Sequence, residues 1–102
     1  MGIYVVNKWA FGGEGIYVGR PSVLGNPFPM KGEADRDRVI VKYRVWLWRK
    51  VRERGQVFAE LMRIRKLAEQ GEVRLICWCS PKPCHGDVIK RCVEWMIREN
   101  VG

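Results

Sequence analysis

The segment Val73-Arg-Leu-Ile-Cys-Trp-Cys79 predicts the central strand of the fold, because it is an apolar run bounded by turn residues. Side chains alternate between the two faces of a strand. One predicted face carries Val73, Leu75, Cys77 and Cys79, and the other carries Arg74, Ile76 and Trp78. We expect the first face to pack on a core and Trp78 to be a packing residue.

Helical patterns flank this strand. One begins at Asp35, whose side chain would cap it, and runs to about Arg54 with apolar residues at helical spacing. A second spans about Val57 to Gln70 and ends before a glycine. A third runs from about Gly86 to Asn100, and Cys92 lies on its apolar face.

Two short strands are predicted near the N-terminus, at Ile3–Val6 and Ile16–Val18. The passage from the second strand through two helices to Val73 is long enough for a right-handed parallel crossover. Residues 1–102 are therefore predicted to form a single small α/β domain. We expect a short, three-stranded, mostly parallel sheet covered by about three helices.

The composition indicates a soluble basic protein with a net charge of +8. No apolar run approaches the roughly 20 residues of a membrane-spanning helix, so we expect no membrane partner. The N-terminal residues resemble no secretory signal, which predicts a cytoplasmic location. The four Cys are then expected to be metal ligands, reactive thiols or core residues rather than disulfides.

The segment Cys77-Trp-Cys-Ser-Pro-Lys-Pro-Cys-His-Gly-Asp87 has the densest chemistry, and three interpretations remain open. In the first, a Zn²⁺ ion is bound by Cys77, Cys79, Cys84 and His85. In the second, Cys84 is a nucleophilic thiolate, with His85 as base or acid and Asp87 as orienting group or second acid. In the third, these are structural residues, which is the simplest account of Cys92.

Two motifs together resemble a known family. They are Gly19-Arg-Pro-Ser-Val-Leu-Gly-Asn-Pro-Phe28 and the Cys77–Asp87 segment, with Tyr43-Arg-Val-Trp-Leu47 on the helix between them. This arrangement resembles the domain of unknown function family 4326, which occurs in bacteria, archaea and their viruses. Both motifs are complete here, but the resemblance implies no particular activity.

The resemblance implies that the two motifs contribute to one site. If their strands are parallel neighbours, the ends of both strands meet at one crevice, where α/β sheets bind ligands. The expected ligand-binding residues are Arg20, Ser22, Asn26 and Gly86, and the expected catalytic residues are Cys84, His85 and Asp87. An Arg beside the free amides of a helix N-terminus suits a phosphate, so a nucleotide or other phosphorylated ligand is predicted. A purely structural role for Arg20 and Asn26, as braces of the loop, stays open.

Two other functions fit the sequence. The basic charge and five Trp are compatible with a non-specific nucleic-acid-binding module. The Cys-rich segment is compatible with a zinc-stabilised structural or protein-interaction module. A homodimer is a further expectation, because Val41, Val45 and Trp48 form a second apolar stripe on the first predicted helix.

Overall fold

The computed structural model describes residues 2–10 and 12–102 of the chain. Its strands and helices follow the predicted order. The strands are β1 (Gly2–Asn7), β2 (Ile16–Tyr17) and β3 (Glu72–Cys77). The helices are α1 (Arg36–Glu53), α2 (Gln56–Gln70) and α3 (His85–Arg98), with one 3₁₀ turn (Glu33–Asp35) before α1.

The sheet has the order β1-β3-β2, and both pairings with the central strand are parallel. Leu75 at the middle of β3 lies opposite Val5 on one side and Ile16 on the other. The predicted small α/β domain with a parallel sheet and β3 at its centre is therefore confirmed. Parallel pairing brings the carboxyl ends of β2 and β3 to the same edge of the sheet.

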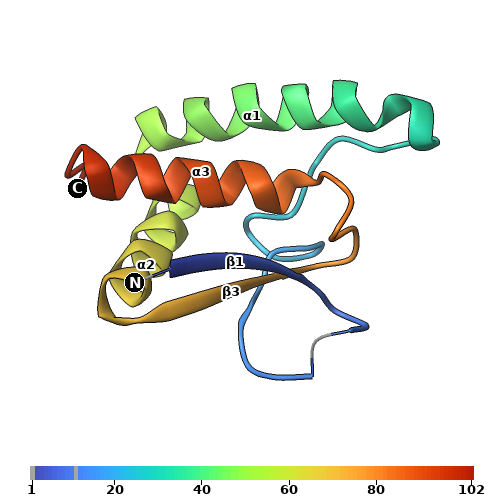
Figure 1. The fold of residues 1–102 in the computed structure, drawn as a ribbon. Coiled ribbons are helices and arrows are strands. Elements are labelled where there is room, and N and C mark those ends of the chain that lie inside the picture. The colour runs from blue at the N-terminus through green and yellow to red at the C-terminus, as the bar shows by residue number, and fades with distance from the viewer. Residues whose placement is uncertain (1, 11) are drawn as a thin grey trace.

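The helices form two further layers on one side of the sheet. Helices α2 and α3 contact the strands, and α1 packs on α2 and α3 instead. Figure 1 shows α3 lying between the strands and α1. No helix that the structure describes is long and apolar enough to cross a membrane.

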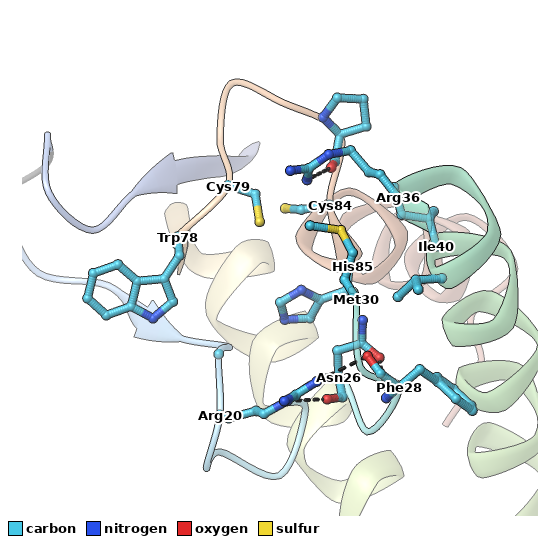
Figure 2. Close-up of a pocket in the computed structure, with 13 residues that line it drawn as sticks. Arg20, Asn26, Phe28, Met30, Arg36, Ile40, Trp78, Cys79, Cys84 and His85 are labelled. Atoms are coloured by element: carbon cyan, nitrogen blue, oxygen red, sulfur yellow. Dashed lines mark hydrogen bonds between the residues drawn. The ribbon is translucent and has the colours of Figure 1, made fainter. Parts of the chain in front are cut away.

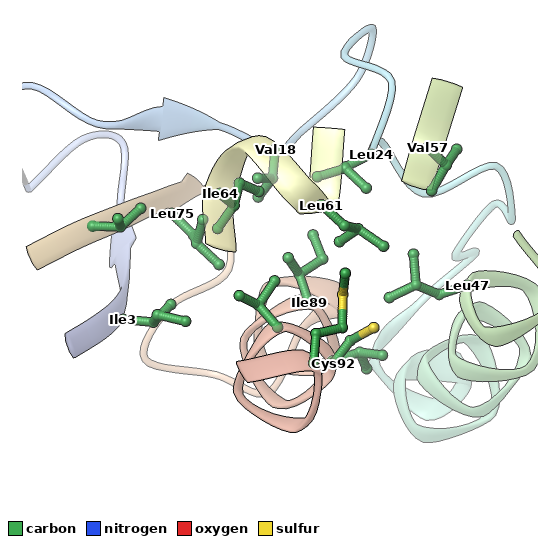
Figure 3. Packing of buried hydrophobic residues seen from close by; sticks show 14 of the residues in the cluster. Ile3, Val18, Leu24, Leu47, Val57, Leu61, Ile64, Leu75, Ile89 and Cys92 are labelled. Atoms are coloured by element: carbon green, nitrogen blue, oxygen red, sulfur yellow. The ribbon is translucent and has the colours of Figure 1, made fainter. Parts of the chain in front are cut away.

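The core lies between the sheet and the helices. Figure 3 shows Ile89 and Cys92 of α3 in its middle, with Leu75 on the sheet side and Leu47 on the α1 side. Cys92 is fully buried, as predicted for a core residue. The opposite face of the sheet is partly exposed and carries Tyr4, Arg74, Ile76 and Trp78. Trp78 packs against the rings of Trp9 and Tyr17, but it is 44% exposed and lies outside the core.

Several element boundaries differ from the sequence prediction by one or two residues, among them the end of β3. Strand β3 ends at Cys77 instead of Cys79. Beyond this end, the side-chain amide of Asn7 donates hydrogen bonds to the carbonyl oxygens of Trp78 and Ser80, which hold the turn beside the end of β1. Asp35 precedes α1 but makes no side-chain capping bond; its carboxylate instead pairs with Arg38.

Candidate functional site

A cavity of about 210 Å³ opens at the edge of the sheet where β2 and β3 end (Figure 2). Three segments line it. They are the loop after β2 between Gly19 and Met30, the first two turns of α1, and the turn between β3 and α3 from Trp78 to His85. The two sequence motifs therefore meet at one cavity, together with the start of α1.

Five of the predicted site residues line this cavity, namely Arg20, Asn26, Cys79, Cys84 and His85. The others do not. Cys77 is buried beneath Cys84, Ser22 lies in the loop outside the lining, and Gly86 packs against β1. The Asp87 carboxylate accepts a hydrogen bond from the Cys84 amide at the start of α3. The structure brings the two motifs together but keeps these four residues out of the cavity lining.

The loop after β2 is held in place by hydrogen bonds. The Arg20 guanidinium donates from Nε to the carbonyl oxygen of Asn26 (2.6 Å) and from Nη2 to that of Phe28 (3.0 Å). The Asn26 Oδ1 atom accepts a bond from the Phe28 amide. Arg20 and Asn26 thus brace the loop, as the structural alternative expects, and they line the cavity as well.

Ser22 makes its contacts through the backbone. Its amide donates to the carbonyl oxygen of Gly19, and its own carbonyl accepts from the amide of Gly25. Its Oγ is buried without a hydrogen-bond partner among the described residues. These contacts make Ser22 part of a tight turn, away from the cavity.

The N-terminus of α3 is capped from within. The Asp87 carboxylate accepts a hydrogen bond from the Cys84 amide (3.0 Å), and the Asp87 amide donates back to Cys84. A Cβ atom on Gly86 would lie 2.9 Å from Cγ1 of Val5, so the first turn is packed tightly against β1. The Asp87 amide is therefore not free for an anion as expected, because the capping box uses it, and an anion site at the rest of this terminus stays a prediction.

Two of the cysteines form a buried pair. The Sγ atoms of Cys77 and Cys84 lie 3.3 Å apart. The hydrogen bond from Cys84, together with the backbone amides of Ser80 and Cys79, lowers the pKa of Cys77. The same bond, together with burial, raises the pKa of Cys84. The Cys84 Sγ atom is buried and engaged with Cys77, which argues against it as the free thiolate nucleophile.

Cys79 has a different environment, because it is only half-buried and lines the cavity beside Arg36. The Arg36 guanidinium forms a two-pronged ion pair with Glu33 and donates to the carbonyl oxygen of Pro83. Its pKa is raised by the bond to Glu33 and by a hydrogen bond to Cys79. Arg36 was not among the site residues predicted from the sequence, because it lies outside both motifs.

Three of the four candidate zinc ligands have other partners. Cys77 and Cys84 contact each other, and the His85 ring bonds to the backbone. Within residues 2–10 and 12–102, no group of three or more Cys, His, Asp or Glu side chains is arranged to hold a metal ion. Zinc binding stays a prediction.

His85 is fixed in one orientation. Its Nε2 atom lies 2.6 Å from the carbonyl oxygen of Val18, and its ring meets that of Tyr43 edge-on at 5.1 Å. A carbonyl only accepts, so Nε2 carries the proton of a neutral ring and Nδ1 is left as an acceptor. Burial lowers the pKa of His85, and the nearby charge of Arg20 acts in the same direction. His85 is therefore neutral at pH 7, with one basic nitrogen.

This lowered pKa predicts a pH dependence of stability. His85 is the only His of the chain, and its ordinary pKa is 6.5. Below pH 6.5 the unfolded chain takes up the proton more readily than the folded chain. The free energy of unfolding therefore decreases as the pH is lowered, until the pH is below the pKa of His85 in the folded protein. Urea unfolding measured between pH 7.5 and 5 should show a steeper fall for the wild type than for His85→Gln. Equal slopes for the two proteins would contradict this role of His85.

The comparison with known proteins gives one match. The family model described as "Domain of unknown function (DUF4326)" matches residues 5–95. That range includes the loop after β2 and the turn before α3. Neither the curated proteins nor the solved structures contain a match.

Proposed function

The chain belongs to the DUF4326 family, whose description names no activity, and we propose from the site itself that it binds a small phosphorylated ligand, such as a nucleotide. The ligand would occupy the cavity at the carboxyl ends of β2 and β3. Ligands of open α/β sheets bind at this edge, because the loops that follow the strands surround it.

Arg20 is the main support for this proposal. Its guanidinium has two bonds to backbone carbonyl oxygens, which fix its orientation, and it has no carboxylate partner among the residues described. A fixed guanidinium with an unneutralised charge favours a phosphate or carboxylate as partner. Arg36, by comparison, is neutralised by Glu33.

The remaining lining suits a small organic ligand. Its apolar part includes Phe28, Met30 and Ile40, and its polar part includes His85 and Cys79. Small-molecule sites commonly combine an apolar wall with a few oriented polar groups. His85 lines the cavity and its Nδ1 atom is left as a proton acceptor, so His85 is the candidate general base for hydrolysis or group transfer on the bound ligand.

Ligand binding can be tested by thermal shift and calorimetry. The panel should contain nucleoside mono-, di- and triphosphates, sugar phosphates, pyrophosphate and inorganic phosphate. We expect at least one phosphorylated compound to stabilise the wild type. Arg20→Ala should weaken its binding about 10- to 100-fold, since a hydrogen bond to a charged group contributes about 1.5–3 kcal/mol.

Arg49→Ala is the matched control, because Arg49 lies on the exposed side of α1 and makes only a weak contact with Glu53 at 3.8 Å. It removes one positive charge without touching the cavity. Arg20→Lys keeps the charge at the site and should bind with intermediate affinity. If no phosphorylated compound stabilises the wild type, or if Arg49→Ala weakens binding as much as Arg20→Ala, the proposal is wrong.

A further inference from the structure

Three aromatic residues and a lysine form a cluster beside the cavity, here called the aromatic platform (Lys8, Trp9, Tyr17 and Trp78). The ring centroids of Trp9 and Trp78 are 5.4 Å apart, and the ring of Tyr17 meets Trp78 edge-on at 6.5 Å. The Lys8 ammonium lies 5.4 Å from the Tyr17 ring and 5.7 Å from the Trp78 ring. Trp9 is 82% exposed, so the platform offers aromatic surface to solvent.

The platform is held in place by hydrogen bonds. The Trp78 indole donates from Nε1 to the Tyr17 hydroxyl (2.8 Å), and that hydroxyl donates to the carbonyl oxygen of Arg20 (2.8 Å). The Trp9 amide donates to Oδ1 of Asn7. Exposed aromatic rings fixed in this way add little to the core, but they lose little conformational entropy when a planar group stacks on them.

The platform reaches the cavity of the proposed phosphate site through Trp78. Trp78 lines the cavity together with Arg20 and His85. Figure 2 shows Trp78 on one side of the cavity and Ile40 on the opposite side, with His85 between them and Arg20 nearer the loop after β2. A ligand with its phosphate at Arg20 could therefore place a planar ring against Trp78.

We propose that the ligand is a nucleoside phosphate whose base stacks on Trp78. This inference rests on the proposed function and specifies the ligand class within it. A stacked base uses the indole face, and the phosphate uses the charge of Arg20. Lys8 adds a second positive charge at the platform, which complements an anionic ligand and disfavours a cationic one.

The test compares ligands that share a phosphate and differ in the base. Calorimetry would measure ribose 5-phosphate, AMP, GMP, CMP and UMP with the wild type, Trp78→Leu and Trp78→Phe. We expect at least one nucleoside monophosphate to bind about tenfold or more tightly than ribose 5-phosphate, because stacking on one aromatic ring gives a gain of this order. In Trp78→Leu the nucleoside monophosphates should bind no more tightly than ribose 5-phosphate binds to the same variant, whereas Trp78→Phe should keep most of the gain over ribose 5-phosphate.

Tyr4→Leu is the matched control, since Tyr4 is an exposed aromatic residue outside the platform on the same face of the sheet. Circular dichroism and melting curves show whether each variant is folded. If Trp78→Leu does not fold, the comparison of wild type with Trp78→Phe remains. Equal affinity for ribose 5-phosphate and all four nucleotides would overturn this inference and leave the proposed function standing. Absence of binding by every phosphorylated compound would overturn both. Tighter, strongly salt-dependent binding of a single-stranded oligonucleotide than of any mononucleotide would also overturn it, in favour of a nucleic-acid interface.

Discussion

Replacing Leu75 with Ala is expected to lower the free energy of unfolding by about 2–5 kcal/mol. Leu75 is fully buried at the middle of β3, where the central strand pairs with both of its neighbours. Truncation removes apolar surface from the core and leaves a cavity that a strand paired on both sides cannot close by moving. Both neighbouring strands restrain the backbone at this position, so we expect a loss in the upper half of the range.

Urea unfolding followed by circular dichroism measures this loss. Leu67→Ala is the matched control, because Leu67 lies on α2 with its side chain 38% exposed. The same atoms are removed there, but little buried surface is lost and Ala favours the helix, so we expect a change below about 1 kcal/mol. Equal losses at the two positions would mean that β3 is not the centre of the core.

The burial of Leu75 illustrates what could be predicted from the sequence. Alternation along residues 73–79 depends only on local backbone geometry, and the order of strands and helices limits the sheet to few topologies. The central position of β3 and its parallel pairing follow from these two constraints. The course of the chain after β3 does not, because the turn is held there by the side chain of Asn7, which is 71 residues from its partner Trp78 in the sequence.

The candidate site was predictable in its location but not in its chemistry. The two motifs follow neighbouring parallel strands, so Arg20 and His85 were expected at one edge and both line the cavity. The role of Asp87 could not be predicted, because the sequence allows its carboxylate either to cap α3 or to face a ligand, and in the structure it caps α3. Arg36 reaches the site only because α1 packs beside the turn before α3, and its bond to Pro83 spans 47 residues. Such packing leaves no periodic signal in the sequence.

Replacing Tyr43 with Phe is expected to loosen the loop that holds Arg20. Tyr43 of α1 is fully buried, and its hydroxyl donates to the carbonyl oxygen of Leu24 at 2.7 Å. Burial raises the pKa of this hydroxyl above its ordinary value, so it remains a donor throughout the neutral range. Without it, the buried carbonyl of Leu24 loses this partner, and we expect the free energy of unfolding to fall by about 1–3 kcal/mol.

Tyr4→Phe is the matched control, because the Tyr4 side chain is 48% exposed and its hydroxyl can exchange bonds with water. We expect it to change the free energy of unfolding by less than about 0.5 kcal/mol, as exposed substitutions generally do. Urea unfolding of both variants measures the difference. Similar values for Tyr43→Phe and Tyr4→Phe would show that the bond to Leu24 does not stabilise the fold.

Tyr43→Phe also distinguishes the contribution of the loop after β2 from that of His85. Phe keeps the ring that meets His85 edge-on at 5.1 Å, so the pH dependence assigned to His85 should persist in Tyr43→Phe. The loop should change instead, with faster hydrogen exchange at the amides of Ser22 and Gly25, which close its turns. Because Arg20 is braced by the same loop, any phosphorylated ligand should bind Tyr43→Phe more weakly than the wild type. Unchanged exchange at both amides would mean that the loop holds its shape through the Arg20 bonds alone.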